Sequence, residues 1–114
     1  MAVILNENSI RNLASDAGED LLGELITVFI DEMGYRKTQV EEACLLYQYQ
    51  ELAHSIKGSA LTFGAEALAE LASVIERRAK GGDDLVKEQL PELVDCLVET
   101  RDRYQGYLDG LESA

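Results

Sequence analysis

The sequence is short of several residue types, and each shortage narrows what the chain can be. It has no tryptophan, one proline and one histidine among 114 residues. Its two cysteines, Cys44 and Cys96, are far apart and form no C-x-x-C pair. We therefore expect no metal site and no haem bundle, because the ligands are missing. Lone thiols of this kind are typical of reduced residues in a cytosolic protein.

Positive charge and long apolar runs are also scarce. Ten lysines and arginines stand against 22 aspartates and glutamates, so the formal net charge is -12. Nucleic acids and anionic membrane surfaces attract basic patches, and we expect neither as a partner. No apolar run approaches the ~20 residues of a membrane span, and residues 1–5 are too short and uncharged for a signal peptide. The sequence predicts one cytoplasmic domain covering residues 1–114.

Nucleotide-binding motifs are absent as well. The chain contains no G-x-x-x-x-G-K-[ST] loop and no glycine-rich dinucleotide turn. It also has no room for the residues of an ATP-binding kinase domain or of a receiver domain. We expect a protein that is not a kinase and cannot phosphorylate itself from ATP.

A helical pattern of apolar residues runs through nearly the whole chain, without strand-like alternation. Asn6 or Asn8 can cap a first short helix, which Gly18 ends. A second helix is predicted from Glu19 to about residue 46, with a turn at 45–50. The remaining helices are expected at about 51–63, 65–80 and 91–112, with a helical stretch at 85–90. This order predicts an all-α fold, an antiparallel four-helix bundle with a short additional N-terminal helix.

The second helix carries more apolar residues than one core contact requires. One stripe consists of Leu22, Ile26, Phe29 and Met33, and a neighbouring one consists of Leu21, Leu25 and Val28. Either the first short helix covers the second stripe, or part of that stripe is a docking surface. The sequence favours neither alternative.

The single histidine lies in the third predicted helix, opposite its core face. The predicted core stripe consists of Leu52, Ile56, Ser59 and Phe63, and the opposite face carries His54, Lys57, Gly58 and Leu61. Gly58 leaves the helix surface beside His54 bare, although a mid-helix glycine costs about 1 kcal/mol relative to alanine. Lys57 can place an ammonium near a group bonded to the ring. This arrangement suits a phosphate acceptor; an ordinary surface histidine with a chance lysine and glycine is the other interpretation.

The segment His54-Ser55-Ile56-Lys57-Gly58-Ser59, followed by Phe63-Gly64-Ala65, resembles the signature of histidine-containing phosphotransfer (HPt) domains. In that family the pattern is His-x-x-Lys-Gly-Ser with a Gly-Ala a few residues later. The resemblance extends from about residue 6 to the end and includes stand-alone phosphorelay proteins. It implies that His54 is the phosphoacceptor, that Lys57 stabilises the phosphoryl group and that Gly58 gives the partner room. Ser59 and Gly64 complete the structural part of the motif.

The resemblance also implies partners: the receiver domains of a hybrid sensor kinase and of a response regulator. Those domains would supply the aspartate and the Mg²⁺, so the chain needs no cofactor of its own and is expected to be a monomer. Leu61, with the row Leu21, Leu25 and Val28, is the predicted docking surface. The rival hypothesis is a helical adaptor that binds a protein partner through its apolar surface, with His54 incidental.

Overall fold

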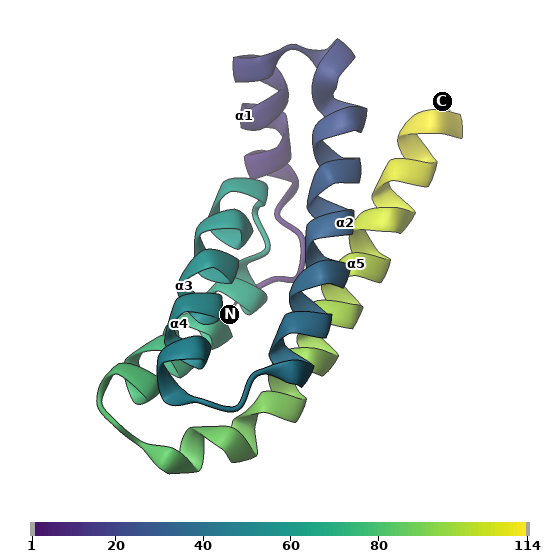
Figure 1. Cartoon of the computed structure of the whole chain (residues 1–114). Helices are drawn as coiled ribbons and strands as arrows, with labels where there is room; N and C mark the ends of the chain where they lie inside the picture. The colour runs from purple at the N-terminus through teal and green to yellow at the C-terminus, as the bar shows by residue number, and fades with distance from the viewer. Residues whose placement is uncertain (1, 114) are drawn as a thin grey trace.

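The computed structural model describes residues 2–113, which form five α-helices and one 3₁₀ helix. The elements are α1 (Glu7–Ala17), α2 (Glu19–Glu42), α3 (Leu46–Phe63), α4 (Glu66–Lys80), the 3₁₀ helix η1 (Asp84–Gln89) and α5 (Leu90–Ser113). Helices α2, α3, α4 and α5 alternate in direction along one elongated bundle, and α1 folds back against the start of α2 (Figure 1). The predicted all-α bundle with a short N-terminal helix is confirmed.

The ends of α1 and α3 follow from local chemistry that the sequence indicated. The side chain of Asn6 accepts hydrogen bonds from the backbone N–H groups of Asn8 and Ser9 and so caps α1. Gly64 ends α3 with a φ of 80°, the left-handed conformation that glycine adopts without strain. Both predicted caps are present.

The predicted turn between α2 and α3 is wrong in its position. We expected α2 to reach about residue 46, but it ends at Glu42 and α3 begins at Leu46. The reason is the side chain of Gln48, whose Oε1 accepts hydrogen bonds from the backbone N–H groups of Cys44 (2.9 Å) and Leu45 (3.0 Å). These bonds satisfy the backbone donors of the two residues just before α3 and so fix the position at which α3 begins.

The buried face of α3 is turned further toward α4 than predicted. Its fully buried residues are Tyr49, Ala53, Ile56 and Ala60. Of the predicted stripe only Ile56 is fully buried, while Leu52, Ser59 and Phe63 lie at its edge. Alanines on both helices allow close approach, since α4 buries Ala69, Ala72 and Ala79. The rotation brings the outer face of α3 next to α4.

An aromatic cluster ties α3 to the two long helices. The ring of Phe29 in α2 stacks on Phe63 at 4.5 Å between centroids and contacts Tyr104 of α5 at 4.8 Å. The hydroxyl of Tyr104 donates to the backbone carbonyl of Phe63 at 2.7 Å. Burial raises the pKa of Tyr104, so this hydroxyl stays protonated and remains a donor. The C-terminal end of α3 is thereby fixed.

The segment before α1 crosses the turn between α3 and α4. The N–H of Asn6 donates to the carbonyl of Gly64 (2.9 Å), and the N–H of Ala67 donates to the carbonyl of Val3 (2.8 Å). The side-chain amide of Asn6 also donates to the carboxylate of Glu66 at 2.5 Å. Residues far apart in the sequence are therefore joined at this end of α3.

None of the helices within residues 2–113 has both the length and the apolar character needed to cross a lipid bilayer.

Candidate functional site

His54 lies near the middle of α3 on the face beside α4. Its side chain is 69 % exposed, so the imidazole faces solvent as predicted. The helix is continuous through this position, from Leu46 to Phe63, and Ile56 and Ala53 on its other side are fully buried. A rigid, anchored backbone therefore presents an accessible ring.

A carboxylate from α4 holds the ring and the neighbouring lysine together. Nδ1 of His54 lies 2.7 Å from Oε2 of Glu76, and Nζ of Lys57 donates to Oε1 of the same carboxylate at 2.5 Å. An ionised carboxylate only accepts hydrogen bonds, so this partner assigns the proton to Nδ1. In the neutral ring Nε2 then carries the lone pair, and the exposed imidazole leaves this nitrogen accessible to an electrophile.

The electrostatics of Glu76 support this assignment. Its side chain is 17 % exposed. The hydrogen bond from Lys57 lowers the pKa of the Glu76 carboxyl, the bond from the histidine adds to this, and partial burial opposes both. Glu76 is therefore a carboxylate at neutral pH and can accept from both neighbours.

The outer face of α3 leaves space around the imidazole. Gly58 is exposed, and a β-carbon built on it would meet nothing within 4 Å. Leu61 is 62 % exposed. Together with Lys57 it lines a shallow depression that continues onto α4 and includes Glu70. The structure thus gathers His54, Lys57, Gly58 and Leu61 on one accessible surface.

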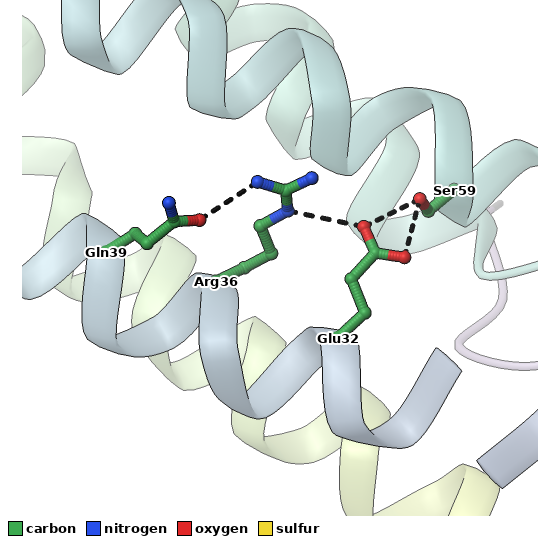
Figure 2. Close-up of polar contacts among 4 residues, drawn as sticks. All are labelled: Glu32, Arg36, Gln39 and Ser59. Carbon is green, nitrogen blue, oxygen red and sulfur yellow. Dashed lines mark hydrogen bonds and ion pairs between the residues drawn. The ribbon is translucent and has the colours of Figure 1, made fainter. Parts of the chain in front are cut away.

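Ser59 points to the opposite flank of α3, toward α2. Its hydroxyl lies 2.9 and 2.8 Å from the two carboxylate oxygens of Glu32 (Figure 2). The same carboxylate accepts from Arg36 at 3.3 Å, and Arg36 donates to Gln39 at 2.9 Å. Ser59 therefore connects α3 to α2 and does not approach the imidazole.

The packing around position 64 leaves no room for a side chain. A β-carbon there would lie 2.7 Å from the β-carbon of Ser9 and 2.9 Å from the backbone oxygen of Asn6. These contacts are too close for any side chain. The glycine thus shapes the end of α3 and admits the segment that precedes α1.

The row Leu21, Leu25 and Val28 lies elsewhere. Glu32 is opposite Ser59 and the two helices run in opposite directions, so the part of α2 beside His54 comes after Glu32 in the sequence. The row comes before it, and the structure does not bring the row to His54. Leu21 and Val28 are 48 % and 64 % exposed. The alternative that α1 covers this stripe is therefore wrong for these two residues.

The sequence reasoning missed Glu76. It lies 22 positions from His54 and follows the apolar stripe of α4 without any local motif. Only the packing of α3 against α4 brings it to the ring. For metals, the described residues 2–113 contain no group of three or more histidine, cysteine, aspartate or glutamate side chains arranged to hold an ion.

Comparison with known proteins agrees with the fold and the motif. The family described as the Hpt domain matches residues 24–111. The phosphorelay protein LuxU of Vibrio harveyi is 31 % identical over 110 residues, covering 91 % of this chain and 95 % of that protein. LuxU of Vibrio vulnificus is 32 % identical over 105 residues, covering 89 % and 91 %.

A solved structure shares the fold at lower sequence identity. The crystal structure of histidine-containing phosphotransfer protein B from Pseudomonas aeruginosa matches with a TM-score of 0.85 and 19 % identity, covering 96 % of this chain and 97 % of that one. The two chains therefore have the same helical architecture over nearly their whole lengths. With the match to residues 24–111 and the curated relatives, it follows that the chain belongs to the Hpt domain family of phosphorelay proteins.

Proposed function

We propose that the protein carries a phosphoryl group on Nε2 of His54, taking it from an aspartate of one receiver domain and passing it to an aspartate of another. One observation carries the proposal. Nδ1 of an exposed imidazole is bonded to Glu76 at 2.7 Å, which leaves Nε2 free on a surface that Gly58 keeps clear. The family membership and the relatives named as phosphorelay proteins support it.

The chemistry needs little from this chain. The lone pair of Nε2 attacks the phosphorus of an aspartyl phosphate, the P–O bond breaks, and the aspartate leaves as a carboxylate. The receiver supplies Mg²⁺ to stabilise the transferring group, and this chain needs no cofactor of its own. The ammonium of Lys57, already next to the ring, is placed to turn toward the phosphoryl oxygens.

The proposal includes partners and surroundings. The donor and acceptor are receiver domains of a hybrid sensor kinase and of a response regulator, in the cytoplasm, and the protein acts as a monomer. They dock on the outer face of α3, where the exposed Leu61, about two turns after His54 on the same face, offers an apolar anchor. The row on α2 remains a second proposed contact, on a separate part of the surface.

The test is a transfer experiment with His54→Gln. Each receiver domain of the source organism is phosphorylated with acetyl phosphate and Mg²⁺ and then mixed with the protein, and acid-labile phosphate on the protein is measured. We expect labelling of the unsubstituted protein by at least one receiver and none of the variant, with identical circular dichroism because the side chain faces solvent. Equal labelling of both proteins would refute the proposal. Receiver binding without any labelling would favour the adaptor hypothesis.

A further inference from the structure

We infer that the protein has a second docking site, at the end of the bundle away from His54, and that its occupant is a short amphipathic helix of a partner protein with basic residues beside its apolar face. The site is a groove lined by α1, the start of α2 and the last turns of α5. The inference does not depend on the proposed role of His54.

At this end the molecule has three helices side by side instead of four. The ring of Phe29 in α2 stacks on Phe63 at the end of α3 and contacts Tyr104 of α5. Residues 19–28 of α2 and 105–113 of α5 therefore extend past α3, by about 13–15 Å at 1.5 Å per residue. Only α1 accompanies them there (Figure 1). Within residues 2–113, nothing takes the place that a fourth helix would have at this level.

The groove between these three helices is mainly apolar. The side chains that matter for docking come from all three helices and are Ile10, Ala14, Leu22, Tyr107, Leu108 and Leu111. Those of α1 and α2 are at most 8 % exposed and form the inner part of the groove, whereas Leu111 is 39 % exposed at its edge. An apolar helix face placed here would cover core residues that α3 and α4 do not reach.

The charges around the groove indicate the chemistry of its occupant. Four exposed carboxylates lie in it or in the depression next to it: Glu19, Asp20, Glu24 and Glu112. Within residues 2–113, none of them forms an ion pair. The one cation that lines the groove, Arg11, is hydrogen-bonded through its guanidinium to the side chain of Asn8. Lysines or arginines beside the apolar face of a partner helix would find complementary charge here.

The same charges argue against a second copy of this chain as the occupant. Each copy has a net charge of -12, so two copies repel one another. The densest basic cluster of the chain, residues 77–80 at the end of α4, is partly engaged already, since Arg78 donates to Asp83 at 2.8 Å and to Gln89 at 2.6 Å. An anionic membrane surface is disfavoured for the same reason.

The groove is distant from the imidazole. Leu22 precedes Glu32 by ten residues, which is about 15 Å along α2. Ser59 lies opposite Glu32, and His54 precedes Ser59 by five residues in a helix of opposite direction, which adds about 7 Å. No member of the row Leu21, Leu25 and Val28 lines the groove. A partner helix can therefore occupy it while the outer face of α3 stays open.

The test uses the intact protein and a synthetic helical peptide of about 12 residues, about 18 Å long, with leucine on one face and lysine beside it. Amide ¹H–¹⁵N shifts of the protein are followed as the peptide is added. We expect saturable shifts concentrated at residues 10–14, 19–23 and 107–112. A peptide of the same composition with its leucines spread around the helix should bind about tenfold more weakly or less, and a version with glutamate in place of lysine should not bind.

Two substitutions test the apolar and the charged part of the groove separately. Leu111→Gln should raise the Kd of the lysine peptide about fivefold or more, because it removes an apolar contact at the edge. Leu85→Gln, the same change at an exposed leucine of η1, should leave the Kd unchanged. Glu112→Gln should raise the Kd about twofold at low salt. Its control is Glu88→Gln, which removes an exposed carboxylate of η1.

Several results would overturn the inference. They are shifts spread over the whole acidic surface, equal binding of the rearranged or the glutamate peptide, and an unchanged Kd for folded Leu111→Gln. Shifts in the groove when the protein alone is concentrated would mean that a second copy occupies it. Phosphoramidate labelling of His54 should be equal with and without saturating peptide, and reduced labelling would place the peptide over the imidazole instead. No receiver domain is involved, so failure of the relay and failure of this inference can be told apart.

Discussion

At the scale of single residues, Gly58 and Gly64 of the HPt-like motif are explained by different physical causes. Gly64 has a φ of 80° and no space for a β-carbon, so its backbone and its packing both require glycine. Gly58 has ordinary helical geometry and open space around it. The fold does not require glycine at position 58. We therefore attribute this glycine to the space that a partner protein needs beside His54.

Gly58→Gln tests this difference. We expect the variant to be more stable by up to about 1 kcal/mol, because glycine is the poorer helix former, and to transfer its phosphoryl group more slowly, because the side chain stands beside His54. Urea unfolding and the receiver assay measure the two effects. Gly58→Ala is the matched control, with the gain in helix propensity and little added bulk. A glutamine variant that is less stable and fully active would show that Gly58 has a packing role instead.

At the scale of helices, α3 is held differently on its two flanks. Toward α4 it meets small buried side chains and the ion pair of Lys57 with Glu76. Toward α2 a polar network of Ser59, Glu32, Arg36 and Gln39 connects the helices (Figure 2). The first flank belongs to the site, and the second keeps α3 in register with α2.

The Ser59→Ala variant measures how much the contact between α3 and α2 contributes to the free energy of unfolding. The hydroxyl bonds a carboxylate, and such hydrogen bonds contribute about 1.5–3 kcal/mol. The pair is only partly buried, so we expect a loss of about 1 kcal/mol in the free energy of unfolding. Chemical phosphorylation of His54 should be unchanged. Ser55→Ala, one turn earlier on α3, makes the same change in helix propensity and is the control. If both variants lose equal stability, the contact with Glu32 contributes nothing specific.

Most helix boundaries could be predicted because the residues that begin or end a helix act through local chemistry. Asn6, Gly18 and Gly64 mark helix ends through their own backbone or side-chain chemistry. The turn after α2 has no such residue, and it depends on Gln48 reaching back to Cys44 and Leu45. Gln48 is the N3 residue of α3, where a capping box has Glu or Gln, but the N-cap position holds Leu45 in place of Ser or Thr. The pattern is therefore incomplete, and the predicted boundary was displaced.

The candidate site likewise contains residues that the sequence could place and one, Glu76, that it could not. The four residues on the outer face of α3 are placed by helical periodicity alone, so the sequence indicated that they lie together. Glu76 comes from another helix, and its position depends on the rotation of α3 caused by Ala53 and Ala60. The predicted core stripe of Leu52, Ile56, Ser59 and Phe63 missed this rotation, since periodicity gives less weight to alanine than to larger apolar residues.

At the scale of the whole molecule, the dominant property is negative charge. A net charge of -12 on 114 residues means that like charges repel one another across the folded surface. The ion pairs at Glu76 and Asp83 are local exceptions, where Lys57 and Arg78 hold the pKa of each carboxyl low. Repulsion summed over the surface should outweigh these few pairs in the response to salt.

We therefore expect salt to stabilise the protein at neutral pH. Raising NaCl from about 10 mM to about 0.5 M shortens the Debye length from about 30 Å to under 10 Å. A gain of about 1 kcal/mol corresponds to a rise of roughly 4–8 °C in Tm for a domain of this size. Thermal melts followed by circular dichroism would measure it. The same salt series near the isoelectric point, at about pH 4.3, is the control, since the effect should shrink there. A Tm that falls with salt at neutral pH would mean that the ion pairs outweigh the repulsion.

The crossing of residues 3–6 over the turn between α3 and α4 has a consequence for how the protein is made. Asn6 and its partner Glu66 are 60 positions apart. A ribosome adding about 5–20 residues per second needs roughly 3–12 s to synthesise the residues between them. During that time the segment before α1 has no binding site, because the carbonyl of Gly64 and the N–H of Ala67 do not yet exist. Residues 3–6 are therefore synthesised well before their binding site, and a nascent chain paused before residue 64 would leave them open to chaperones and proteases.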